Sequence, residues 1–137
     1  MSRVCFDENG SIHGFPYHDG SLLGVLTDAK SRDIHLALCA VSGEQRILSL
    51  RNVKAMDVSG FREGNIVLDL SIFPAKRVAN IAEVLKKLEE RLFITEANLP
   101  PETLVFWLVS SYGAEILAVC DDVEVGEVGS RLALNKP

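Results

Sequence analysis

The residues best suited to chemistry gather near the start of the chain, where His13, Tyr17, His18 and Asp19 fall within seven positions. Two imidazoles and a carboxylate are groups that bind a metal such as zinc or transfer protons in general acid–base catalysis. A metal site would need a further protein ligand, and these residue types also occur in ordinary polar loops. There, His18 and Asp19 would pair with each other or with the backbone. We therefore treat all four residues as ligand candidates, and His13, His18 and Asp19 as candidate metal ligands.

A second candidate lies in the glycine-bounded loop 59–65, where Phe61 is followed directly by Arg62. Aromatic and arginine side chains are favoured anchors of protein–protein interfaces, so these two residues are candidates for contact with a partner. The alternative is a packed loop in which the stem of the arginine simply covers the aromatic ring.

Signatures of catalysis and of cofactor binding are missing from the sequence. It contains no phosphate-binding loop, no dinucleotide fingerprint and no serine nucleophile elbow. The three cysteines are too widely spaced for a zinc ribbon or a CxxC redox motif. We therefore expect no catalytic residue and no cofactor, and the sequence favours a protein that is not an enzyme.

Composition narrows the class of protein and of partner. The chain has 137 residues, of which 47% are hydrophobic and 24% charged, as expected for one globular domain. Its net charge of −5 argues against nucleic acid as a partner, because binding phosphates requires clustered Lys and Arg. We expect no secretion signal, since the first ten residues carry no apolar core of one, and no apolar run approaches the roughly 18 residues of a membrane span. We expect a cytoplasmic domain that binds neither membranes nor nucleic acid.

Alternating apolar and polar residues predict that β-strands dominate the fold. Ile34, Leu36 and Leu38 lie on one side of an extended chain, and Leu68 and Leu70 repeat the pattern further on. This period of two is typical of half-buried strands. Short turns between the segments favour antiparallel pairing. We expect about seven to eight strands in an antiparallel curved sheet or a partly open barrel.

One amphipathic helix is predicted over residues 75–93, because apolar residues recur there at spacings of three and four. The stripe consists of Val78, Ile81, Leu85, Leu88 and Leu92. We expect it to pack on the sheet and to share one core with the inward strand residues, which makes the fold α+β. A single domain would then span 1–137, with an irregular segment at 1–20 and a tail at 130–137.

Three short patterns carry a family resemblance. They are YHDGSL at 17–22, FREGNI at 61–66 and SSYGAE at 110–115, with the alternating segments between the first two. In this order they resemble small uncharacterised bacterial proteins that are rich in β-structure, some of which are grouped with the immunity proteins of polymorphic toxin systems. The resemblance implies a small binding protein without catalysis of its own, and it assigns no role to any single residue.

Together these features favour a non-enzymatic module that binds another protein, and the acidic balance suits a basic partner such as a toxin. One alternative is a small enzyme, or a protein that binds a ligand or metal, with its site in the segment 13–19. A second alternative is a homo-oligomeric structural protein, in which unpaired strand edges form a homodimer across a two-fold axis.

Overall fold

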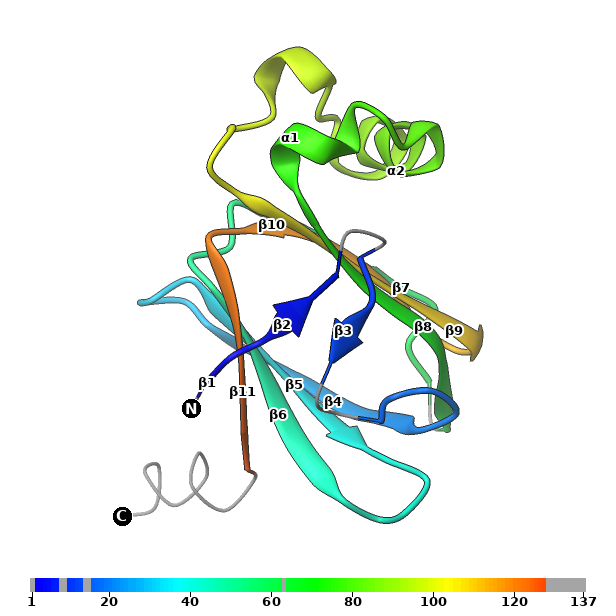
Figure 1. Cartoon of the computed structure of the whole chain (residues 1–137). Coiled ribbons are helices and arrows are strands. Elements are labelled where there is room, and N and C mark those ends of the chain that lie inside the picture. The colour runs from blue at the N-terminus through cyan, green and yellow to red at the C-terminus, as the bar shows by residue number, and fades with distance from the viewer. Residues whose placement is uncertain (1, 8–9, 14–15, 63, 128–137) are drawn as a thin grey trace.

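A computed structural model describes residues 2–7, 10–13, 16–62 and 64–127, with the backbone alone at His13. Among these residues, one curved antiparallel sheet of nine strands carries a helical segment on part of its outer face (Figure 1). The predicted α+β class is confirmed, with slightly more strands than expected. The predicted tail at 130–137 lies outside the described residues.

The main sheet consists of β1 (Ser2–Arg3), β4 (Ser21–Asp28), β5 (Asp33–Cys39), β6 (Gln45–Arg51), β7 (Ala55–Ser59), β8 (Asn65–Pro74), β9 (Leu104–Tyr112), β10 (Glu115–Cys120) and β11 (Asp122–Glu127). A short ribbon consists of β2 (Cys5–Phe6) and β3 (Ile12–His13), so the segment expected to be irregular contributes three two-residue strands. The helical turns are α1 (Ala75–Val78), α2 (Ala82–Lys87), the π-helix η1 (Leu88–Leu92) and the 3-10 helix η2 (Glu96–Asn98).

The sheet curls into a partly open barrel because two long bent stretches run side by side. The strand order is β1-β11-β6-β5-β4-β8-β9-β10-β7. Strand β6 continues through a short bend into β7, and β10 continues into β11. β6 pairs with β11, and β7 pairs with β10. The chain connections therefore bring β7, at one end of the strand order, next to β6 and β11 near the other end. Pairing is weak between β4 and β8, where the described partners are Ser21 with Ile66 and Leu22 with Asn65.

The N-terminal segment lies along β8 beyond this weak pairing. The Asp19 N–H donates to the Val67 carbonyl at 2.9 Å, and the Val67 N–H donates to the Gly20 carbonyl at 2.8 Å. Further along, the Ile72 N–H donates to the Gly10 carbonyl at 2.8 Å. The chain before β4 therefore satisfies backbone groups of β8 that β4 does not reach.

The barrel interior confirms the alternation predicted for β5. Ile34, Leu36 and Leu38 are buried in the main core, while the residues between them are half-buried on the outer face. The prediction that Leu68 points inward is wrong. The register of β8 against β9 shifts between Ile66 and Asp69, so Val67 is fully buried and Leu68 is 45% exposed. A bulge of this kind reverses the facing of the residues that precede it.

The helical segment falls within the predicted range but is interrupted after α1. Ile81 has φ −122° and ψ 86°, which are not helical values. The interruption follows Asn80, whose side-chain type competes with the helical backbone for hydrogen bonds. Val78 and Leu88 of the predicted stripe are fully buried, but after the break Val84, which lies outside the stripe, is fully buried and Leu85 is only half-buried.

The prediction of one shared core is also wrong, because the described residues form two hydrophobic clusters. Val78 and Leu88 of the helical segment pack with Val105 of β9 and Val119 of β10. The inward residues of β5 belong to the other cluster, inside the barrel. Since β9 is apolar on both faces, it takes part in both clusters and separates them.

Candidate functional site

The first candidate segment lies against the start of β8. His18 Nδ1 is 2.7 Å from the Leu68 carbonyl oxygen, and this nitrogen donates because a carbonyl oxygen only accepts. The other ring nitrogen, Nε2, is 3.6 Å from Asp19 Oδ1, and both side chains are about two-thirds exposed. Asp19 takes a left-handed backbone conformation with φ 62°. Backbone contacts thus hold His18 and Asp19 on the barrel surface. This is the arrangement expected if the two residues pair with each other or with the backbone in an ordinary polar loop.

The other two candidates of this segment are His13 and Tyr17. Neither can be described as a metal ligand beside His18 and Asp19. His13 lies on β3 opposite Cys5, and its side chain falls outside the described residues. Tyr17 is half-buried and packs against the main core. Burial raises the pKa of its phenol, and the nearby carboxylates Asp69 and Asp7 raise it further, so the phenol stays protonated at neutral pH. Within the described residues, no three His, Cys, Asp or Glu side chains cluster to hold a metal.

In the second candidate, the loop between β7 and β8, the side chains of Phe61 and Arg62 are exposed to solvent. Phe61 is half exposed, and the Arg62 guanidinium carbon lies 4.8 Å above the centre of the Tyr112 ring. This distance is within the range of a cation–π contact. The aromatic ring that the arginine covers therefore belongs to Tyr112 of the β9–β10 hairpin.

Asn65 fixes this loop on the barrel. Its side chain is buried, and Oδ1 accepts hydrogen bonds from the N–H groups of Arg62 at 3.0 Å and Ala114 at 2.9 Å. Its Nδ2 donates to the Leu22 carbonyl at 3.3 Å and to the carbonyl of Arg62. Gly113 has φ 107° and packs so closely that an added Cβ would lie 2.2 Å from Asn65 Oδ1. The β7–β8 loop, the β9–β10 turn and β4 are thereby joined through one carboxamide.

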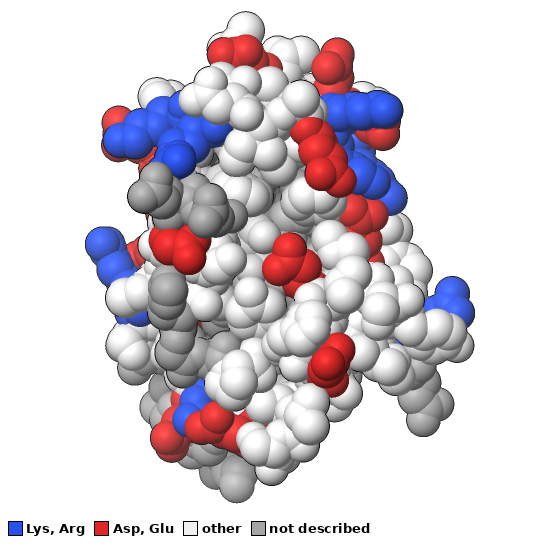
Figure 2. Space-filling view, turned by 45° about the vertical axis from the view of Figure 1, so that its right-hand side comes forward, with Lys and Arg blue, Asp and Glu red and all other residues white. Residues whose placement is uncertain are grey.

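These contacts create one exposed apolar surface, which we name the β8 patch. It consists of Phe61, Arg62, Ile66, Leu68 and Tyr112. Ile66 pairs with Tyr112 across the strands, so their side chains project from the same face. The end of β9 lies at the right of Figure 1, and Figure 2 turns that side forward: much of it carries neither acidic nor basic side chains.

The structure thus brings both sequence candidates to the same strand. His18 hydrogen-bonds to the backbone of Leu68, and Arg62 stacks on the residue that pairs with Ile66. Sequence reasoning missed Ile66, Leu68 and Tyr112 as surface residues. The bulge in β8 hid the first two, since alternation places them inside. Tyr112 carried a signal of exposure, because at the end of β9 it directly precedes Gly113, a residue type that favours turns.

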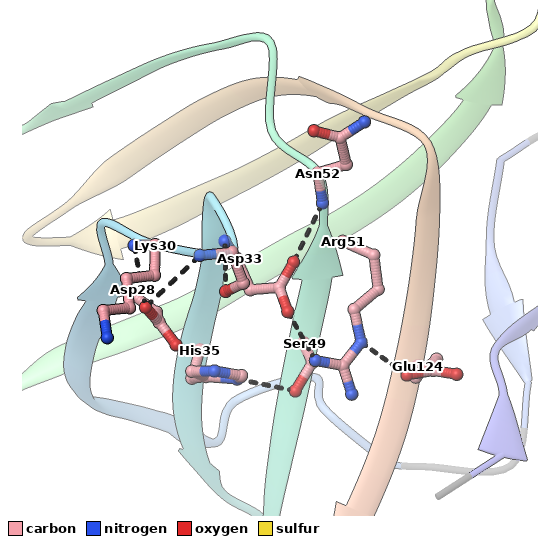
Figure 3. Close-up of polar contacts among 9 residues, drawn as sticks. Asp28, Lys30, Asp33, His35, Ser49, Arg51, Asn52 and Glu124 are labelled. Atoms are coloured by element: carbon pink, nitrogen blue, oxygen red, sulfur yellow. Dashed lines mark hydrogen bonds and ion pairs between the residues drawn. The ribbon is translucent and has the colours of Figure 1, made fainter.

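A polar network covers another part of the barrel, where β5, β6 and β11 lie side by side (Figure 3). Arg51 joins Glu124 at 2.6 Å and Asp33 at 2.8 Å, and the Asn52 N–H donates to Asp33 Oδ1 at 3.0 Å. Burial alone would raise the pKa of Asp33, but these hydrogen bonds outweigh burial and lower it. Because its charged groups already pair with one another across β5, β6 and β11, this network holds strands together and is a poor candidate for a site.

A hollow of about 380 Å³ opens between the β4–β5 turn and the bend that joins β6 to β7. Its lining includes the apolar side chains of Ile34, Val53 and Met56 and the charged residues Arg32 and Lys54. The sequence analysis placed Ile34 in the core but assigned none of these residues to a site, since the two segments are brought together only by the curl of the sheet.

No family model and no curated protein matches this chain. Of the helices described, none is both long enough and apolar enough to cross a membrane.

Proposed function

We propose that this protein is a non-enzymatic binding module that holds another protein against the β8 patch. The observation that carries the proposal is the stacking of Arg62 on Tyr112 beside the exposed side chains of Phe61, Ile66 and Leu68. Tyrosine and arginine are among the residues that contribute most to binding energy at interfaces. Neighbouring apolar side chains exclude water around such residues when a partner docks.

The platform beneath the patch also favours binding. Because the hydrogen bonds of Asn65 fix the β7–β8 loop to the β9–β10 turn, little loop motion remains to be lost when a partner binds. The surface is thus prepared for contact before the partner arrives. A loop without these bonds would have to be ordered during association, which weakens affinity.

The charge of the chain supports a basic partner. With a net charge of −5, the protein would attract a cationic protein at long range and speed its association. The concrete version that we propose is an immunity-type role, in which the β8 patch binds and neutralises a basic toxin. The three cysteines are free thiols, which is compatible with a reducing bacterial cytoplasm.

The proposal is tested with the product of a gene adjacent to this one in its native source, purified and titrated against the protein by calorimetry. Phe61→Asp and Tyr112→Asp are each expected to weaken binding by roughly 30-fold or more, the loss typical of an interface hot spot. Val41→Asp is the matched control, because Val41 is 74% exposed in the turn between β5 and β6.

Thermal unfolding of each variant shows whether the fold is kept. Equal affinity of Phe61→Asp, Tyr112→Asp and Val41→Asp for the same partner would rule out the β8 patch as the contact surface. If the Asp variants instead dissociate a homodimer seen by sedimentation of the wild type, the partner is a second copy of this chain, and the toxin-binding version is wrong.

A further inference from the structure

The hollow between the β4–β5 turn and the β6–β7 bend has an apolar floor and a charged rim. At about 380 Å³ it falls within the usual range of small-molecule sites, roughly 300–1,000 Å³. Ile34 and Val53 on its floor are members of the main core, and Met56 packs against that core. An apolar group seated here would therefore extend the interior of the barrel, and the mouths of β-barrels are common ligand sites.

Two cations from different segments belong to the lining. Arg32 belongs to the β4–β5 turn and Lys54 to the β6–β7 bend. The Val53 N–H donates to the Arg32 carbonyl at 2.8 Å, which ties the two sides of the hollow together. Lys54 Nζ lies 3.8 Å from Asp121 across exposed surface, a contact that contributes little. Both cations therefore remain able to approach an anion.

The carboxylate at the rim is occupied by its own turn. Asp28 Oδ1 accepts the N–H of Lys30 at 3.0 Å and that of Ser31 at 3.4 Å. These bonds, led by that of Lys30, lower the pKa of Asp28 and fix its charge on the turn backbone. The lining thus holds one carboxylate, which is hydrogen-bonded to its own turn, against the two cations Arg32 and Lys54.

We infer that this hollow binds a small organic anion with an unbranched apolar body, of the class of medium-chain carboxylates. The carboxylate lies between Arg32 and Lys54, and the chain lies over Ile34, Val53 and Met56. Two cations on opposite sides position an anion better than one, because each donates to a different oxygen. The site is separate from the β8 patch and does not depend on the function proposed for that surface.

The test uses sodium octanoate, titrated by calorimetry and by the chemical shift of the Met56 methyl group. Arg32→Asn removes the charge and keeps the backbone, because asparagine tolerates the left-handed conformation that Arg32 adopts at φ 61°. We expect this variant and Lys54→Gln each to weaken octanoate binding by about fivefold or more, the effect of losing one charge-assisted hydrogen bond. Lys30→Gln is the control, because Lys30 lies in the same turn but not in the lining.

Octanol tests the binding of the apolar chain separately from the binding of the carboxylate. It has the same chain without the charge, and we expect it to bind the wild type more weakly than octanoate and to be insensitive to Arg32→Asn. The inference is overturned if octanoate leaves the Met56 methyl shift unchanged at millimolar concentration. It is equally overturned if Arg32→Asn and Lys54→Gln bind octanoate as tightly as Lys30→Gln. Phe61→Asp should bind octanoate normally, so this result is independent of the outcome at the β8 patch.

Discussion

Asn65 shows how one buried side chain holds three segments that are distant in sequence. A carboxamide has two acceptor sites on its oxygen and two donor hydrogens on its nitrogen, and here all four positions have backbone partners. Removing the side chain would leave N–H groups of Arg62 and Ala114 and the Leu22 carbonyl without these partners. Unsatisfied buried groups cost more than the hydrogen bonds contribute, because they also lose their contact with water.

We predict that Asn65→Ala lowers the free energy of unfolding by about 2–4 kcal/mol, as expected when a buried hydrogen-bond network is broken. Urea denaturation followed by circular dichroism measures the change. Asn80→Ala is the control, since Asn80 is exposed in the turn after α1, and we expect a change within about 0.5 kcal/mol. A loss at Asn65 no larger than that of the control would mean that water replaces its partners at no cost.

Cys120 provides a prediction about pH. Burial raises the pKa of its thiol to about 12, and the charges of Asp121 and Asp122 add to the effect. The thiolate is therefore favoured in the unfolded chain, where the pKa is near 9.0. Because the folded pKa lies above the unfolded one, the contribution to stability is complete below pH 9.0 and is lost as the pH rises toward about 12.

We accordingly expect a thiol reagent at pH 8 to label the exposed Cys5 quickly and Cys120 only as fast as the protein unfolds. The alkaline decline in the free energy of unfolding should be shallower in Cys120→Ala than in the wild type. Rapid labelling of all three thiols in the native protein would contradict the burial of Cys120.

At the scale of the elements, the burial of a side chain could be predicted only where the local alternation of residues decides which way that side chain faces. In β5 no bulge interrupts the pairing with β6, so the alternation of Ile34, Leu36 and Leu38 predicted their burial correctly. In β8 the facing is set by the register against β9, and the bulge that moves Leu68 outward has no signal in its own sequence. For the helix predicted at 75–93, the spacing of the apolar stripe indicated the element correctly, but the interruption at Ile81 was not predicted.

In the candidate site, too, some residues could be predicted from local sequence and others could not. Phe61 and Arg62 could be predicted as surface residues, because a glycine-bounded loop between strands is local information. Their neighbours in the β8 patch come from strands that pair over long distances, so only the fold reveals the surface as a whole. Whether His13 joins His18 and Asp19 in a metal site stays a prediction.

Phe93 ends the helical segment in a conformation that suits glycine. It has φ 57°, and the Ile94 N–H after it donates to the Leu88 carbonyl at 3.2 Å. Residues with a Cβ are strained in this left-handed region by about 1–2 kcal/mol, and glycine is not. The side chain is also 84% exposed, so the ring loses little when it is removed.

We predict that Phe93→Gly raises the free energy of unfolding by about 0.5–1 kcal/mol, since relief of strain exceeds the greater entropy of glycine in the unfolded chain. Phe93→Ala is the matched control, because alanine keeps the Cβ and should give no such gain. Thermal unfolding of the two variants decides the matter, and a stability of Phe93→Gly at or below that of Phe93→Ala would contradict the prediction.

On the scale of the whole molecule, β9 and β10 separate an inner core from an outer helical layer. Arg91 on the π-helix adds polar anchors to this layer, through Asp57 of β7 at 2.9 Å and Glu115 of β10 at 2.9 Å. The Trp107 indole N–H donates to the same Glu115 at 2.7 Å. Neither this layering nor the pairing of 45–59 with 115–127 has a local signal, because both depend on contacts between distant parts of the chain.

Two cores imply that the helical layer can open without the barrel. Leu88 is fully buried in the outer cluster and Leu36 in the inner one. Truncating either to alanine removes similar buried volume and should cost about 2–5 kcal/mol.

We predict that Leu88→Ala speeds amide hydrogen exchange in α2 and η1 while the amides of β5 and β6 stay protected, because the barrel keeps its own core. Leu36→Ala should speed exchange in the barrel and the helical layer alike, since the helices cannot pack once the sheet is lost. If Leu88→Ala instead exposes β5 as much as α2, the two clusters unfold as one unit, and β9 transmits the loss of packing from one face to the other.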